Sequence, residues 1–176
     1  GLGEIRQGVG AADHVDGVHR PRLRDPGAGV LVPGDRRQGD LLATPLQIAR
    51  MTAGAVSGRL CKVSILKDSQ VVCEDLGLKT ENIEIVTSGM KQVCQVGGTA
   101  FPFFDFVPPV MCKTGTAQHG GQKSESDLPH AWIVVVYPAE NPEMVLTVML
   151  DSAGEGSYEA GPVAREILER WLSAKR

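Results

Sequence analysis

The stretch PPVMCKTGTAQHGG, residues 108–121, places a short apolar run directly before Lys113, Thr114, Gly115 and Thr116. Its two prolines precede the apolar residues, so that the run itself can form a paired strand. Lysine supplies a positive charge and the threonine hydroxyls donate hydrogen bonds, which together bind an anion. The glycine lets another extended backbone approach closely. We therefore expect an edge strand that binds a peptide through its carboxylate.

The lysine-threonine-glycine triplet has two other interpretations. A phosphate-binding loop needs a glycine immediately before the lysine, and Cys112 stands there, so this interpretation fails. A strand surface without any binding role is the second alternative. The surrounding residues favour binding, and the backbone N–H of Thr116 would then point to the place where an oxyanion forms.

Two nearly continuous apolar runs follow, HAWIVVVYP from His130 and MVLTVML from Met144. Such runs are typical of strands covered on both faces, and the turn-rich link AENPE between them suits antiparallel neighbours. A C-terminal helix is predicted with Pro162 in its first turn. Its apolar stripe is expected to comprise Val163, Ile167, Leu168, Trp171 and Leu172.

Two helices are predicted upstream of these strands. The first has Thr44 as its N-cap and Pro45 in its first position, and it ends at Gly58. The segment 62–72 reads as two short strands around an Asp-Ser turn, and a second helix follows with Thr80 as its cap. The elements together predict an α/β fold (α+β layers) in which an antiparallel sheet packs against helices.

Composition excludes several classes of function. The formal net charge of −3 gives no electrostatic basis for binding nucleic acid. The longest apolar run is far shorter than the ~20 residues of a membrane helix, and no leader segment is visible at the start.

The four cysteines are Cys61, Cys73, Cys94 and Cys112, and none has a histidine or a second cysteine at metal-ligand spacing. We expect no metal and no cofactor. Free thiols in or near the core are expected, and a Cys61–Cys73 bridge across a hairpin is the alternative in an oxidising compartment.

Four segments carry a resemblance to a known family: CKTGTAQHGG, HAWIVVVYPAENPE, GPVAREILERWL and, upstream of them, QGDLLATPLQIAR. In this order they resemble the C-terminal half of a class B penicillin-binding protein transpeptidase domain, of the elongation type (penicillin-binding protein 2). The resemblance covers roughly residues 38–176, and we take residues 40–176 as the part of the domain that is present.

The resemblance implies a serine acyl-transferase that cross-links peptidoglycan and is acylated by β-lactams. Lys113 would then lie beside a serine of the family's second motif, Thr114 and Thr116 would bind the substrate carboxylate, and the Thr116 amide would complete an oxyanion hole. Gly115, Ala117 and Gln118 would line the bound peptide. The implied partners are the peptidoglycan stem peptide, β-lactams and a cell-elongation glycosyltransferase. The implied location is the extracytoplasmic (periplasmic) face of a bacterial inner membrane, with an anchoring N-terminal helix that this chain does not contain.

The sequence departs from the family at the nucleophile. It has no S-x-N motif, and the S-x-x-K from Ser64 to Lys67 stands only 49 residues before Lys113 and in a predicted strand. We reject Ser64 as the nucleophile, and we expect the isolated chain to be inactive. A serine β-lactamase or β-lactam sensor domain, and a non-catalytic peptide-binding fragment, are the alternatives.

Residues 1–39 differ from the rest, since they lack aromatic residues and any regular period, and we expect them to be irregular. Their Arg, Gly, Ala, Pro, Val, Asp and His are what GC-rich codons give out of frame. Roughly residues 5–36 are therefore interpreted as a frameshifted segment, with a divergent natural loop as the alternative. Further along, His130 is interpreted as structural. The polar residues of the loop after the strand are expected to be solvated, namely His119, Gln122, Lys123, Ser124, Glu125 and Asp127.

Overall fold

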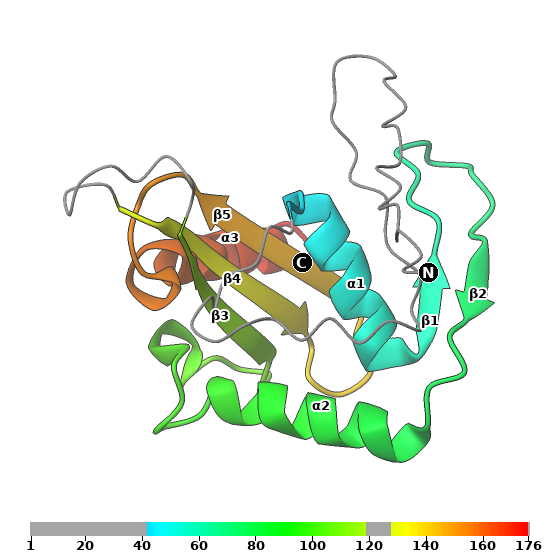
Figure 1. The fold of residues 1–176 in the computed structure, drawn as a ribbon, viewed down its shortest axis with the longest axis horizontal. Helices are drawn as coiled ribbons and strands as arrows, with labels where there is room; N and C mark the ends of the chain where they lie inside the picture. Colours follow the sequence, from blue (N-terminus) through cyan, green and yellow to red (C-terminus); the bar gives the residue numbers. More distant parts are fainter. Residues whose placement is uncertain (1–41, 119–127, 176) are drawn as a thin grey trace, which may run out of the picture. The chain divides into compact units, whose positions relative to one another are not determined.

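The computed structural model describes residues 42–118 and 128–175 (Figure 1). The irregular segment and the domain boundary predicted near residue 39 lie outside these residues. The described elements run in the order α1 (Pro45–Ser57), β1 (Arg59–Cys61), β2 (Cys73–Asp75), α2 (Thr80–Val93), η1 (Phe101–Phe103), β3 (Met111–Ala117), β4 (His130–Tyr137), β5 (Met144–Leu150), η2 (Gly156–Ala160) and α3 (Gly161–Ala174).

The centre of the fold is an antiparallel sheet in the order β3-β4-β5. Gly115 lies opposite Trp132 in the β3–β4 pair, and Ile133 lies opposite Val148 in the β4–β5 pair. Helix α3 packs against one face of the sheet and α1 contacts the other, while α2 lies against β3 (Figure 1). The predicted α/β arrangement, an antiparallel sheet packed against helices, is therefore confirmed.

The main hydrophobic core lies between the sheet and α3. It contains Cys112, Ile133 and Val135 from the strands and Ala164 and Leu168 from α3, each at most 1% exposed. The C-terminal helix is confirmed, but its buried stripe differs from the predicted one. Val163 and Ile167 are exposed, and Ala164 is buried in their place. Alanine is small enough to fit where α3 packs against the sheet. A search for the most hydrophobic residues alone does not predict that Ala164 is the buried one.

The two apolar strands differ in how well they are covered. In β4 four consecutive residues from Ile133 to Val136 are buried, as expected for the central strand. In β5 only Val148 is buried, and the remaining residues are half-buried. The prediction of full cover is therefore wrong for β5, because this strand pairs on one side only among the described residues.

Helix α1 follows its sequence signals. Thr44 and Gln47 form a capping box: the Thr44 hydroxyl accepts from the Gln47 amide, and the Gln47 side chain accepts from the Thr44 amide. Gly58 ends the helix with a φ of 72°, a left-handed conformation that favours glycine. Both ends of α1 are where the sequence predicted them.

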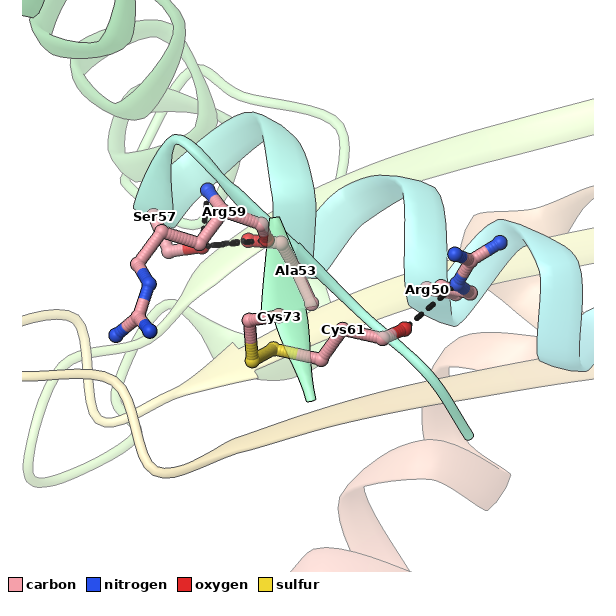
Figure 2. The surroundings of a disulfide bond; sticks show 6 residues. All are labelled: Arg50, Ala53, Ser57, Arg59, Cys61 and Cys73. Atoms are coloured by element: carbon pink, nitrogen blue, oxygen red, sulfur yellow. Dashed lines mark hydrogen bonds between the residues drawn. A yellow bond between two sulfur atoms is a disulfide. The ribbon is translucent and has the colours of Figure 1, made fainter. Parts of the chain in front are cut away.

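The hairpin after α1 differs from its prediction. Its strands are β1 and β2, which flank residues 62–72, whereas the segment 62–72 itself has no strand. A disulfide joins Cys61 to Cys73, which lie directly opposite each other (Figure 2). The Arg50 Nε of α1 donates a hydrogen bond to the Cys61 carbonyl at 2.7 Å and ties this hairpin to the helix. The strand ladder ends at this cysteine pair, and one further backbone hydrogen bond joins the Lys62 amide to the Val72 carbonyl at 2.8 Å.

Helix α2 begins where expected, but Thr80 is its first residue and Lys79 is the N-cap, without a side-chain hydrogen bond. No residue of α2 is fully buried. Its C-terminal end, Cys94, contacts the core below β3. Helix α2 therefore contacts the core through its C-terminal end, next to β3.

Candidate functional site

The predicted binding residues Lys113 to Ala117 lie in β3, which is an edge strand among the described residues, and Gln118 follows it directly. Met111 packs with Val136 on the face toward α1, and Cys112 packs in the core toward α3. Because side chains alternate along a strand, Lys113, Gly115 and Ala117 lie on the α1 side, and Thr114, Thr116 and Gln118 project toward the opposite side. Side chains on both faces of β3 therefore contribute to the candidate site.

The Lys113 ammonium lies at the open side of this strand. The Lys113 side chain is exposed, and its Nζ donates a hydrogen bond to the Thr114 carbonyl at 2.7 Å. That carbonyl is therefore accessible on the side of β3 away from β4. The N–H and C=O of one residue point to the same side, and the sides alternate along the strand. The Thr116 amide thus points to the same open side as the Thr114 carbonyl.

Gly115 has a close neighbour on each face of the sheet. A Cβ at Gly115 would lie 3.3 Å from the Trp132 Cβ. On the opposite face Gly156 of η2 lies so close to the sheet that a Cβ there would be 2.1 Å from the Trp132 carbonyl oxygen and 2.5 Å from that of Gly115. The middle of the candidate site is thus held by backbone contacts, which resist displacement more than flexible side chains do.

A second disulfide joins Cys94, at the end of α2, to Cys112, next to Lys113. The prediction of free thiols is wrong, since all four cysteines are paired, and the alternative Cys61–Cys73 bridge is confirmed. The Cys94–Cys112 pair could not be found from spacing, because it depends on how α2 packs against β3. Cys94 and Cys112 are 6% and 0% exposed, so the bond lies within the core and fixes the start of the candidate site.

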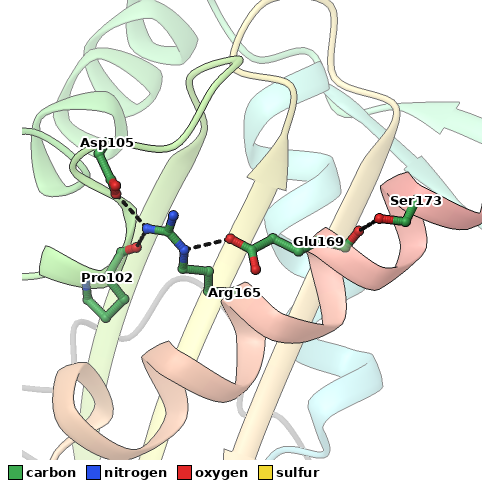
Figure 3. A network of polar contacts seen from close by, with 5 residues as sticks. All are labelled: Pro102, Asp105, Arg165, Glu169 and Ser173. Atoms are coloured by element: carbon green, nitrogen blue, oxygen red, sulfur yellow. Dashed lines mark hydrogen bonds and ion pairs between the residues drawn. The ribbon is translucent and has the colours of Figure 1, made fainter.

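Arg165 of α3 connects this helix to η1, the segment leading into β3 (Figure 3). Its Nη1 donates hydrogen bonds to the Pro102 carbonyl and to Asp105, and its Nε donates to Glu169 at 2.8 Å. The hydrogen bond from Arg165 lowers the pKa of the Asp105 carboxyl, and the same bond raises the pKa of Arg165. This network was not predicted, since no local pattern joins residues 60 positions apart.

Among the described residues, the two other singled-out side chains, His130 and Ser64, do not lie on β3. His130 begins β4 opposite Ala117, and its Nδ1 lies 2.9 Å from Asp151. Ser64 lies in the exposed segment between β1 and β2, not in a strand as expected, and its hydroxyl accepts from the Leu66 amide. The polar loop from His119 to Asp127 lies outside the described residues.

The family model of the penicillin-binding protein transpeptidase domain matches residues 2–169. The chain belongs to this family. A curated relative, the peptidoglycan D,D-transpeptidase MrdA of Haemophilus influenzae, is 30% identical in an alignment 163 residues long that covers 78% of this chain and 25% of the relative. The chain therefore spans about a quarter of the length of this transpeptidase.

Solved structures of the same family share the fold. The penicillin-binding protein 2 in the complex with MreC from Helicobacter pylori is 27% identical, with a TM-score of 0.66 over 79% of this chain and 26% of that chain. A chain of a peptidoglycan synthase complex, described for the coordination of polymerization and crosslinking, is 32% identical, with a TM-score of 0.65 over 74% of this chain and 24% of that chain. The resemblance to the elongation-type penicillin-binding proteins is thereby confirmed.

Proposed function

We propose that this chain supplies the substrate-binding strand of a peptidoglycan D,D-transpeptidase that cross-links the cell wall. The observation that carries the proposal is the edge strand β3, on which the Lys113 ammonium and the backbone groups of Thr114 and Thr116 lie at the same open side. An extended peptide can add to such an edge through main-chain hydrogen bonds. The family membership supports the assignment to the D-alanyl-D-alanine end of the stem peptide.

The proposed chemistry is acyl transfer. A serine contributed by an upstream part of the longer protein attacks the carbonyl between the two D-alanines, an ester forms, and the terminal D-alanine leaves with a proton. An amine of a neighbouring strand then attacks the ester, a new amide forms, and the serine recovers its proton. In this scheme the Thr116 N–H stabilises the oxyanion, and Lys113, Thr114 and Thr116 bind the terminal carboxylate. Gly115, Ala117 and Gln118 line the peptide.

The partners and the location belong to the same proposal. We place the longer protein at the periplasmic face of the inner membrane, because disulfides such as Cys61–Cys73 and Cys94–Cys112 persist in oxidising compartments. No helix in the described part of the chain has the length and apolar content of a membrane span. The solved complexes of similar proteins support MreC and a glycan polymerase as partners. β-Lactams are proposed as ligands of the same strand.

The test uses the complete domain, meaning this chain joined to its upstream part with the serine. Lys113→Ala should lower the rate of β-lactam acylation by about 100-fold or more, since it removes a charged group at the catalytic centre. Thr116→Ala should lower it less, because the backbone amide remains. Equal acylation of Lys113→Ala and the unaltered domain would refute the assignment.

A hydrolytic role on the same strand is the alternative, and acyl-enzyme lifetime separates the two. A transpeptidase retains the acyl group of a β-lactam, whereas a β-lactamase releases it within seconds or less. Intact-mass measurement of the complete domain after a short exposure to penicillin reads this lifetime directly. Rapid loss of the added mass would favour the β-lactamase.

A further inference from the structure

Thr99, to which the sequence analysis gave no role, reaches the candidate site. Its hydroxyl lies 2.8 Å from the hydroxyl of Thr114, the second residue of the lysine-threonine-glycine triplet. Thr99 comes from the loop between α2 and η1, and its side chain is exposed. The two hydroxyls therefore meet at the surface where β3 is open to a ligand.

The loop that carries Thr99 is held firmly. Ala100 is fully buried, and its amide donates to the Val93 carbonyl at 2.9 Å. A Cβ at Gly98 would lie 2.4 Å from the carbonyl oxygens of both Gln92 and Val93, so the loop packs directly on the end of α2. The Cys94–Cys112 disulfide then joins this end to β3. The packing of Gly98 and Ala100 and the Cys94–Cys112 disulfide thus fix the position of Thr99 relative to Thr114.

The direction of the hydrogen bond follows from what each group can donate. A threonine hydroxyl has one hydrogen and two lone pairs, and an ionised carboxylate only accepts. If Thr114 gives its hydrogen to a bound carboxylate, it can only accept from Thr99. Thr99 must then be the donor, and a chain of donors runs from Thr99 through Thr114 to the ligand. Such chains polarise their members and strengthen the final bond.

We propose that Thr99 is a positioning residue, which orients the Thr114 hydroxyl toward the carboxylate of the substrate or β-lactam. The inference rests on the proposed function of β3. It assigns to the loop after α2 a part in substrate recognition, in addition to its structural link with the strand.

The test compares two substitutions in the complete domain. Thr99→Val keeps the shape but removes the hydroxyl, and it should lower the efficiency of acylation by a carboxylate-bearing penicillin by about 3- to 10-fold, the usual effect of one hydrogen bond. Thr99→Ser keeps a hydroxyl and should restore most of the efficiency. Thr87→Val is the matched control, because the Thr87 hydroxyl bonds only to the Glu84 carbonyl within α2 among the described contacts. It should leave acylation unchanged.

Two further measurements separate positioning from a general structural effect. With the methyl ester of the same penicillin, Thr99→Val should react like the unaltered domain, because the ester lacks the charged acceptor. Adding Thr99→Val to Thr114→Val should cost nothing more, since Thr99 acts through Thr114. Equal losses for acid and ester, no rescue by Thr99→Ser, or additive losses in the double variant would each overturn the proposal. If the unaltered domain is not acylated at all, the proposed function fails, and this inference fails with it.

Discussion

A single methyl group at residue 156 would meet backbone atoms, not a flexible side chain. Gly156→Ala places its Cβ against the Trp132 and Gly115 carbonyl oxygens. Since η2 or the sheet must then shift, we expect a loss of about 1–3 kcal/mol in the free energy of unfolding of the complete domain, together with slower β-lactam acylation. Urea denaturation followed by fluorescence measures the first effect.

Gly89 supplies the matched control for this substitution. It lies within α2, and a Cβ there would have no neighbour within 4 Å. Gly89→Ala should therefore stabilise the domain by about 0.5–1 kcal/mol, because alanine loses less conformational freedom in a helix. A destabilised Gly89→Ala or an unchanged Gly156→Ala would contradict this account of the two sites.

The Asp105–Arg165 pair predicts a pH dependence. The pKa of Asp105 is lowered in the folded chain, chiefly by its hydrogen bond from Arg165. A lowered pKa means that the pair contributes stability above the ordinary aspartate pKa of 3.8, and that the contribution disappears as pH falls through the lower folded value. Asp105→Asn should thus unfold at a lower temperature than the unaltered domain at pH 7, and this gap should close as the pH falls below the ordinary aspartate pKa and through the lower folded value.

The change in unfolding temperature caused by Asp105→Asn should be small, because Asp105 is exposed and solvent screens its interaction with Arg165. Asp68→Asn, in the exposed segment between β1 and β2, is the comparison, and it should not change the unfolding temperature at either pH. A gap between Asp105→Asn and the unaltered domain that persists undiminished in acid would show that Asp105 acts through something other than its charge.

At the scale of elements, the two disulfides have different expected effects. Cys94–Cys112 joins α2 to β3 inside the core, whereas Cys61–Cys73 closes the hairpin beside α1. Replacing Cys94 and Cys112 together by alanine should cost about 2–4 kcal/mol in unfolding free energy. It should also slow acylation of the complete domain, since Cys112 adjoins Lys113.

The double replacement of Cys61 and Cys73 by alanine is the control for this prediction. The Cys61–Cys73 bond closes a shorter loop than Cys94–Cys112 does. Its removal should lower stability while leaving acylation within about twofold of the unaltered rate, because the hairpin packs against α1. Chemical denaturation and fluorescent penicillin labelling, measured on the same preparations, give both quantities. If the two double variants slowed acylation equally, the Cys94–Cys112 bond would contribute only to stability and not to the position of Lys113.

Elements with local signals were predictable from the sequence. Thr44, Pro45 and Gly58 defined α1 to the residue, because caps and glycine conformations depend on neighbours within one turn. The hairpin was placed wrongly because residues 62–72 alternate like a strand, while the actual pairing is confined to the residues beside the Cys61–Cys73 bond.

The candidate site could be predicted only in part for a related reason. Lys113 and its neighbours on β3 are contiguous, so the motif alone was enough to propose a role for them. The groups that contact this strand come from two other segments, Cys94 and Thr99 from the end of α2 and its loop and Gly156 from η2, and they meet it only after α2 and η2 have packed on the sheet. No periodicity or spacing indicates such contacts, because they depend on tertiary structure.

The chain as a whole combines the proposed binding strand with a sequence that lacks the family's serine motifs in their expected places. The sequence has no S-x-N and two S-x-x-K matches, which begin at Ser64 and Ser88. Ser64 lies in an exposed segment, where its hydroxyl accepts a hydrogen bond from the Leu66 amide, and Ser88 is an exposed residue within α2. Nucleophilic catalysis needs a serine within hydrogen-bond reach of a base. The isolated 176-residue chain should therefore form no covalent adduct with a fluorescent penicillin, as judged on a denaturing gel. Labelling that Ser64→Ala abolishes would reverse this conclusion, and would make Ser64 the nucleophile.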